Sequence, residues 1–226
     1  MGNICVMLSM SFKVLSKLKI QDVYMKTKIA KLDYYYLEVK QIASLTQGVR
    51  LGRYEDNHGM SYRLISPKNI DGLTLQGELD EVKLANVDQG KHCLRLNDIV
   101  MTMRSKIGAA SLVVEDFAGS IVDHHLAVLR CESPFKVLPN YLVAILNSEW
   151  FYHSQLSSIT GESTVISISL SQLRKLKIPV PSLENQSKIA DLLFAMDSLR
   201  QTSLNALKIR QQIAEQSLFQ LFGENV

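Results

Sequence analysis

The residues best suited to contacting nucleic acid lie in one short stretch, residues 47–54, which reads Gln-Gly-Val-Arg-Leu-Gly-Arg-Tyr. It places a glutamine, two guanidinium groups and an aromatic ring on a loop that contains two glycines. Arginine can bridge guanine O6 and N7 or hold a phosphate, and glutamine can pair with adenine. The composition predicts contacts in a DNA groove, with an ordinary solvated loop as the alternative for any single cluster of this kind.

Further polar clusters support the prediction of DNA contacts, because they recur within one part of the chain. They are Lys68-Asn69, the run Arg104-Ser105-Lys106, and a loop at residues 160–164 whose hydroxyl and backbone N–H groups suit phosphates. The predicted DNA-contacting residues are Gln47, Arg50, Arg53, Tyr54, Lys68, Asn69, Arg104, Ser105, Lys106, Gly161, Ser163 and Thr164.

One sequence pattern of low specificity is compatible with a metal-dependent nuclease. Asp71 and the triplet Glu81-Val82-Lys83 match the carboxylate and Glu-x-Lys sets that hold Mg²⁺ and orient water. The same triplet occurs at residues 38–40, so a match this short arises easily by chance. The sequence has no Walker loop and no G-x-G-x-x-G, G-x-S-x-G or H-E-x-x-H motif. We therefore predict a non-catalytic chain and keep the nuclease as a rival hypothesis.

The histidines and cysteines do not form a metal-binding pattern in the sequence. His124 and His125 are adjacent, and neighbours in a strand point to opposite faces, so we predict one in the core and one at the surface. Cys5, Cys93 and Cys131 are odd in number and widely spaced. This favours reduced thiols in the cytoplasm over a disulfide framework or a zinc site. We predict no metal or cofactor bound by this chain.

Composition and charge describe a folded chain with a local basic excess. Of 226 residues, 46% are hydrophobic and the net charge is +3. Residues 1–33 carry six Lys and two Asp, whereas residues 34–183 carry 15 basic and 15 acidic side chains. Any phosphate binding in the middle segment must therefore come from local clusters. No apolar run approaches the ~18 residues of a bilayer span, and the first residues lack the basic region of a secretory signal, so no membrane segment is predicted.

Three regions follow from the pattern along the chain. Residues 1–33 predict a basic amphipathic helix that packs on the protein's own core or faces a membrane or nucleic acid. Residues 34–130 alternate short β-rich runs with turn residues, and residues 141–155 predict a helix after Pro139. Together they predict an α/β or α+β domain over residues 34–182, followed by a helical region over residues 183–226.

The last region predicts one long helix. Ile178-Pro179-Val180-Pro181 enforces an extended segment, Ser182 is a natural N-cap, and residues 183–222 contain neither proline nor glycine. Forty residues at 1.5 Å each make a rod of about 60 Å, which needs a partner to cover it. An apolar seam, irregular at residues 200–203, predicts a helical hairpin or dimer, and a helix lying on its own domain is disfavoured because the proline segment would swing it away. The seam comprises Ile189, Leu193, Met196, Leu204, Leu207, Leu218 and Leu221, with Ala214 and polar Gln211 between them.

Three stretches of this sequence resemble the specificity subunit of type I restriction-modification systems. Residues 96–108 (LNDIVMTMRSKIG) match a strand-turn motif of its target-recognition domain, except that Asn97 replaces the usual glycine before Asp98. Residues 170–181, ending in Ile-Pro-Val-Pro, and residues 183–190 (LENQSKIA) match the junction that opens its long conserved helix. The resemblance covers about residue 39 to the end, and the Pro-x-Pro junction is its most specific part.

The resemblance implies a reader of DNA sequence that performs no catalysis itself. Such a subunit has two recognition domains and two conserved helices, whereas this chain has one of each. It therefore implies a homodimer through the C-terminal helix that reads a bipartite, palindromic site on double-stranded DNA. Methyltransferase subunits, and a restriction subunit in systems that have one, would bind S-adenosylmethionine, ATP and Mg²⁺. The alternatives are the nuclease of Asp71, Glu81 and Lys83, and a helical scaffold that does not bind DNA.

Overall fold

The computed structural model describes residues 33–104, 107–133, 136–157 and 167–222. The chain divides into two compact units, Met1–Asp33 and Tyr34–Val226. The predicted amphipathic helix within residues 1–33 lies outside the described residues. Within the described ranges, no helix is long and apolar enough to cross a membrane.

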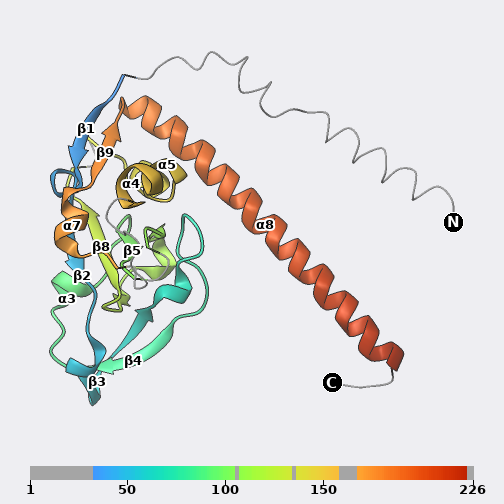
Figure 1. Ribbon diagram of the computed structural model, residues 1–226. Coiled ribbons are helices and arrows are strands. Elements are labelled where there is room, and N and C mark those ends of the chain that lie inside the picture. Colours follow the sequence, from blue (N-terminus) through green and yellow to red (C-terminus); the bar gives the residue numbers. More distant parts are fainter. Residues whose placement is uncertain (1–32, 105–106, 134–135, 158–166, 223–226) are drawn as a thin grey trace, which may run out of the picture. The chain divides into compact units, whose positions relative to one another are not determined.

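The described part of the second unit has three sheets (Figure 1). The four-stranded antiparallel sheet has the order β2 (Ala43–Gln47), β8 (Leu126–Cys131), β5 (Ile99–Thr102) and β6 (Ala110–Leu112). The three-stranded sheet has the order β4 (Asp80–Leu84), β3 (Glu55–Ile65) and β7 (Ile121–Val122), with only the β3–β7 pair parallel. The two-stranded antiparallel sheet pairs β1 (Tyr35–Glu38) with β9 (Lys177–Val180).

Helices and short helical turns connect these strands. The α-helices are α3 (Gln89–His92), α4 (Pro139–Leu146), α5 (Glu149–Phe151), α7 (Leu170–Lys175) and α8 (Leu183–Phe222). The short 3₁₀ turns are η1 (Val39–Gln41), η2 (Leu51–Arg53), η3 (Pro67–Asn69) and η4 (Glu115–Phe117), and η5 (Tyr152–Leu156) is a π-helical turn. This mixed sheet domain followed by a long C-terminal helix confirms the predicted fold class.

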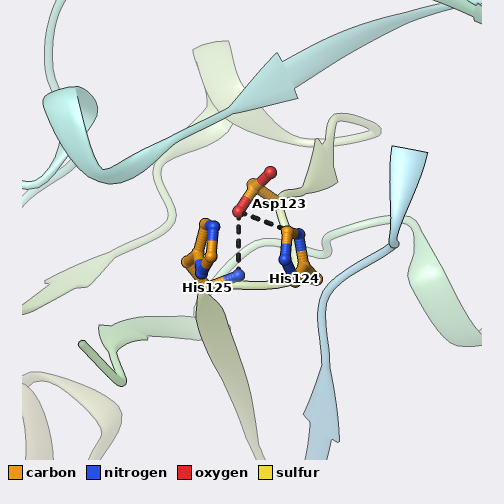
Figure 2. A group of neighbouring side chains, drawn as sticks. All are labelled: Asp123, His124 and His125. Carbon is orange, nitrogen blue, oxygen red and sulfur yellow. Dashed lines mark hydrogen bonds and ion pairs between the residues drawn. The ribbon is translucent and has the colours of Figure 1, made fainter. Parts of the chain in front are cut away.

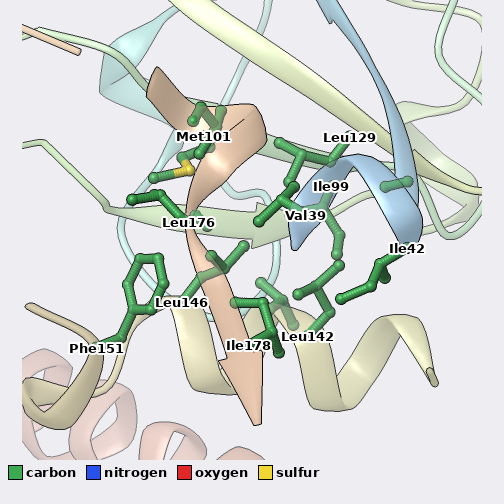
Figure 3. Packing of buried hydrophobic residues seen from close by; sticks show 14 of the residues in the cluster. Val39, Ile42, Ile99, Met101, Leu129, Leu142, Leu146, Phe151, Leu176 and Ile178 are labelled. Atoms are coloured by element: carbon green, nitrogen blue, oxygen red, sulfur yellow. The ribbon is translucent and has the colours of Figure 1, made fainter. Parts of the chain in front are cut away.

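The central strands β5 and β8 of the four-stranded sheet are covered on both faces, which explains why they read as continuous apolar runs. In β5, Ile99 and Met101 belong to the larger hydrophobic core, whereas Val100 belongs to a second core on the other face. Successive strand residues point to opposite faces, so a strand covered on both sides must be apolar throughout. Figure 3 shows the larger core, where α4 and β9 pack on the sheet.

The helix predicted over residues 141–155 is interrupted at Asn147 and Ser148. The Asn147 side chain hydrogen-bonds to the backbone of β6. It accepts the Ala110 N–H at 3.2 Å and donates to the Ala110 carbonyl at 2.7 Å. Ser148 then caps α5 by accepting the Phe151 N–H at 3.2 Å. After this break, Trp150 of α5 is 42% exposed, so the single helix predicted over residues 141–155 is wrong.

The proline-containing segment before α8 is extended, as predicted, but it is also paired. Pro179 lies opposite Tyr36 in the β1–β9 ladder, and Ile178 lies opposite Leu37. The buried Tyr141 hydroxyl of α4 donates to the Pro179 carbonyl at 2.6 Å. The segment is therefore fixed on the domain instead of acting as a free linker.

Helix α8 has the predicted bounds but lies partly on its own domain. Its first half packs against α4, and both Gln186 and Ala190 are buried. Ile189 also packs against the larger core, so the prediction that the helix swings away from its domain is wrong for this half. All residues from 202 to 222 are exposed.

Candidate nucleic-acid interface

The loop after β2 presents two arginines on an anchored backbone. Leu51 and Tyr54 pack partly buried against the small hydrophobic cluster around Val49. Arg50 and Arg53 are exposed. Within the described part of the chain, neither guanidinium group makes a hydrogen bond or an ion pair. Both are thus available to a phosphate or a base edge.

These arginines line a groove of about 550 Å³. Its walls are Gly48, Val49, Arg50, Gly52, Arg53, Tyr54 and His92. His92 comes from α3 and was not predicted, because nothing in the sequence links this short helix to the arginine loop. Partial burial lowers the pKa of His92, and the charge of Lys91 lowers it further. The imidazole is therefore neutral at neutral pH, and the arginines supply the positive charge of the groove.

The start of this loop is held against the turn between β7 and β8. Gly48 has no room for a side chain, since a Cβ there would overlap the carbonyl oxygens of Val122 and Asp123. The Val49 N–H donates to the Val122 carbonyl at 2.6 Å. Gln47 Nε2 donates to the His124 carbonyl at 2.8 Å. The Gln47 side-chain oxygen and its second amide hydrogen therefore remain for a base.

The predicted pair Lys68 and Asn69 has mainly structural contacts. Asn69 is 1% exposed, and its amide accepts from the Ser66 N–H at 3.0 Å and donates to the carbonyls of Gln76 and Glu78. Its side chain thus joins the turn at residues 66–69 to the carbonyls of residues 76 and 78, and the predicted base contact is wrong for this buried residue. Lys68 is exposed and forms an ion pair with Asp80 at 2.6 Å.

The other predicted DNA-contacting residues are only partly described. Arg104 is exposed, and its backbone forms an isolated bridge with Ser167. Ser105, Lys106, Gly161, Ser163 and Thr164 lie outside the described residues. The structure therefore brings together Arg50, Arg53 and Tyr54, with Gln47 at the start of the same loop.

The rival nuclease residues do not assemble into a metal site. The Asp71 carbonyl accepts from Arg200 and Gln201 of α8, whereas Glu81 on β4 accepts the Ser61 hydroxyl at 3.4 Å. Lys83 lies exposed on the same strand. Among the described residues, Asp71 and Glu81 belong to no group of three His, Cys, Asp or Glu side chains close enough to share an ion.

Asp123, His124 and His125 do form such a group. The positions of the two histidines contradict the prediction that one lies in the core and the other at the surface. His124 and His125 lie in a turn that precedes β8, not in a strand, and both are partly exposed. Their rings face each other with centroids 3.9 Å apart and planes tilted by 39°. Figure 2 shows both rings beside Asp123. The prediction of one core and one surface histidine is wrong because a turn does not alternate side chains as a strand does.

Two residues in the matched sequence motifs are buried scaffold residues, not interface residues. Asp98 is 2% exposed and accepts from Arg130 Nε at 2.8 Å and Nη2 at 2.7 Å. The hydrogen bonds that Arg130 donates to Asp98 raise the pKa of Arg130, which stays charged. Gln186 is fully buried, accepts the Leu138 N–H at 2.9 Å and donates to the carbonyls of Lys136 and Pro181.

One curated protein is similar to this chain in sequence, and solved structures share its fold. The chain is 24% identical over 216 residues to a protein described as the type I restriction enzyme MjaX specificity subunit of Methanocaldococcus jannaschii, a match covering 91% of this chain and 50% of that protein. Its fold resembles the HsdS subunit from Thermoanaerobacter tengcongensis (TM-score 0.59, 16% identity, 86% of this chain and 50% of that chain). It also resembles the type I restriction-modification system S subunit from M. genitalium (TM-score 0.58, 16% identity, 87% and 48%). The chain spans about half the length of these relatives.

The family match covers most of the chain and agrees with the fold. The model described as "Type I restriction modification DNA specificity domain" matches residues 38–215, from the end of β1 to within α8. This span includes the arginine groove as well as the buried Asp98 and Gln186. The chain therefore belongs to the type I restriction modification DNA specificity domain family, which confers DNA specificity and is not catalytic.

Proposed function

We propose that this chain reads DNA sequence for a type I restriction-modification complex and performs no catalysis itself. The observation that carries the proposal is the groove in which Arg50 and Arg53 are exposed and, among the described residues, without ion-pair partners. Arginine guanidinium groups supply the bidentate contacts that distinguish guanine in the major groove. The interface comprises Gln47, Arg50, Arg53 and Tyr54, with Lys68, Arg104, Ser105, Lys106, Gly161, Ser163 and Thr164 as further contacts.

Methylation and restriction are then catalysed by partner proteins. Methyltransferase subunits dock on the helical region, residues 183–226, and a restriction subunit joins in systems that have one. These partners bind S-adenosylmethionine, ATP and Mg²⁺, and this chain directs them to its target in the cytoplasm. The family membership of residues 38–215 supports this division of labour.

Two copies of this chain would make one complete reader. The chain matches about half the length of its relatives, and residues 202–222 of α8 are exposed. Two chains paired through α8 place their recognition domains at opposite ends of a helical spacer. Forty helical residues span about 60 Å, so the half-sites can lie more than one ~34 Å DNA turn apart. Two-fold symmetry makes the half-sites identical and inverted.

Genome-wide methylation mapping tests this proposal. The chain is co-expressed with its methyltransferase partner, and we expect methylation at a bipartite, inverted-repeat motif. The Arg50→Ala/Arg53→Ala variant should lose that methylation, because it removes both free guanidinium groups from the groove. Arg174→Ala/Lys175→Ala removes the same charge from exposed positions on α7 and should retain the motif.

Two results would contradict parts of the proposal. A continuous or asymmetric motif rules out the two-fold dimer, and unchanged methylation in the arginine variant rules out the groove. Binding of the isolated chain to a duplex at low salt, where phosphate contacts are strongest, separates a reader from a scaffold. A chain with no affinity there would be a helical scaffold.

A further inference from the structure

We propose that Asp123, His124 and His125 form a binding site for one transition-metal ion that takes nitrogen and oxygen ligands, such as Zn²⁺. The three residues occupy the turn between β7 and β8. Reading DNA does not require this site, and the inference stands independently of the proposed function. It rests on the arrangement of the three side chains in Figure 2.

The ligand atoms are spaced for a small ion. Each residue offers one nitrogen or oxygen, and these atoms all lie within 4.8 Å of one another. Asp123 Oδ1 and His124 Nδ1 are 3.5 Å apart, longer than the ~2.9 Å typical of an N–H···O hydrogen bond. Bonds of about 2.0–2.1 Å from zinc to nitrogen and oxygen put neighbouring ligands of a tetrahedral site about 3.3 Å apart. The observed separation therefore suits two metal ligands better than a hydrogen-bonded pair.

Two buried ring nitrogens at this turn make no hydrogen bond within the described residues. Nδ1 of His124 and Nδ1 of His125 are buried and accept or donate no hydrogen bond within the described residues. A neutral imidazole has one nitrogen with a free lone pair, and that lone pair is also a metal ligand. His92 Nδ1 is buried and unpartnered as well, but His92 belongs to no such group in the described chain. A metal ion would satisfy both histidines of the turn and the carboxylate at once.

The turn is already held in place by bonds to both neighbouring sheets. The Asp123 N–H donates to the Ile65 carbonyl at 2.9 Å, and the Gln47 side chain holds the His124 carbonyl. Asp123 Oδ1 accepts the His125 N–H at 2.8 Å, which orients the carboxylate toward the rings. Ligands fixed in this way need little rearrangement to bind an ion. Because Gly48 and Val49 pack on the same turn, a bound ion would also stiffen one wall of the arginine groove.

Metal titration of the full chain, made without a histidine tag and stripped with a chelator, tests this site. Co²⁺ serves as the spectroscopic probe, and Zn²⁺ is followed by calorimetry and by its displacement of Co²⁺. We expect one equivalent per chain. The His124→Gln/His125→Gln variant should bind at least about tenfold more weakly, since loss of even an outer-shell partner costs 10–100-fold in affinity. His92→Gln removes another histidine with a buried, unpartnered Nδ1 and should leave the affinity unchanged.

A milder substitution covers the case in which the double variant fails to fold. Asp123→Asn keeps an oxygen that accepts the His125 N–H but removes the carboxylate charge. Zn²⁺ should raise the melting temperature of the unmodified chain and have a smaller effect on Asp123→Asn. Substoichiometric binding, or equal affinity in the unmodified chain and the Asp123 and histidine variants, would overturn the proposal.

Discussion

At the scale of single residues, Asn97 shows how this chain departs from its family motif without losing the turn. Asn97 has a φ of 67°, in the left-handed region where glycine is the usual residue. Asparagine populates that region more readily than other side chains, because its short polar group bonds locally. The glycine-to-asparagine difference noted in the sequence is therefore compatible with the observed backbone.

Substitutions at this position should separate backbone conformation from side-chain contacts. We expect Asn97→Gly to change the free energy of unfolding by no more than about 1 kcal/mol. Asn97→Val should destabilise the protein by about 1–3 kcal/mol, because a β-branched residue is strained at this φ. Urea denaturation of both variants measures the difference. Equal stabilities would show that the turn relaxes to another conformation.

The buried pair Asp98–Arg130 should contribute far more to stability than an exposed pair. Replacing Asp98 with alanine leaves the Arg130 guanidinium partly buried without its carboxylate. We expect a loss of about 3–5 kcal/mol in the free energy of unfolding. Asp80→Ala breaks the exposed ion pair with Lys68 and should cost no more than about 1 kcal/mol. Similar losses in the two variants would contradict the structural role assigned to Asp98.

Burial also sets the reactivity of Cys131. Desolvation raises the pKa of this thiol from 9.0 to about 11, so the folded chain holds the proton more tightly than the unfolded chain. This contribution to stability is complete below pH 9 and is lost as the pH rises toward 11. At pH 8 we expect iodoacetamide to modify Cys131 much more slowly in the native protein than in urea, measured by peptide mass spectrometry. Equal rates would show that the thiol is accessible.

At the scale of elements, a polar contact joins the middle of α8 to the loop at residues 71–73. The Leu73 N–H donates to Asp197 Oδ2 at 2.9 Å, and Arg200 Nη2 donates to the Asp71 carbonyl at 3.2 Å. Gly72 leaves room for this approach, since a Cβ there would collide with the side chains of Asp197 and Gln201. The contact explains why the apolar seam is irregular near residue 200: this part of the helix faces its own domain.

Removing this contact should loosen α8 without unfolding the domain. We expect Asp197→Ala to increase amide hydrogen exchange in peptides spanning residues 190–201, because a buried donor loses its partner. The free energy of the lost hydrogen bond, about 1–3 kcal/mol, sets the size of the effect. Asp191→Ala removes an exposed carboxylate from the same helix and should leave the exchange unchanged. Unchanged exchange in Asp197→Ala would show that the hydrophobic contacts of the first half suffice.

At the scale of the whole molecule, the second half of α8 presents an apolar row to solvent. Leu204, Leu207, Leu218 and Leu221 are between 48% and 79% exposed. With Gln211 and Ala214 they recur in alternating steps of three and four, the spacing of a coiled-coil seam. A helix with such a row becomes stable by covering it with another helix, and a second copy of the chain offers the same row. The dimer and its seam remain predictions.

Charge placed on this row should separate the two copies. We expect the unmodified chain to sediment at twice its mass of 25.4 kDa, and Leu207→Glu/Leu218→Glu to sediment as a monomer. Asn205→Glu/Gln216→Glu adds the same charge to the opposite side of the helix and should leave the dimer intact. An unmodified chain that is monomeric at micromolar concentration would contradict the dimer.

The elements that depend on local chemistry could be predicted from the sequence. The absence of proline and glycine over residues 183–222 and the Ser182 cap were sufficient for the bounds of α8. Alternating turn residues and apolar runs were sufficient for the mixed α/β class, and the Pro-x-Pro junction was sufficient for the family. These features depend on residues within a few turns of one another, so they can be read from neighbours along the chain.

Long-range contacts, in contrast, determine which polar side chains form hydrogen bonds inside the fold. Asn147 interrupts the predicted helix because it bonds to Ala110, and Gln186 fixes α8 to a loop some fifty residues earlier, at Lys136. Asn69 is withdrawn from the predicted interface, whereas the turn at residues 123–125 brings two histidines to one side. Each outcome depends on a contact or a chain reversal that local periodicity does not encode, and this is why the long helix was predictable while its docking and the histidine cluster were not.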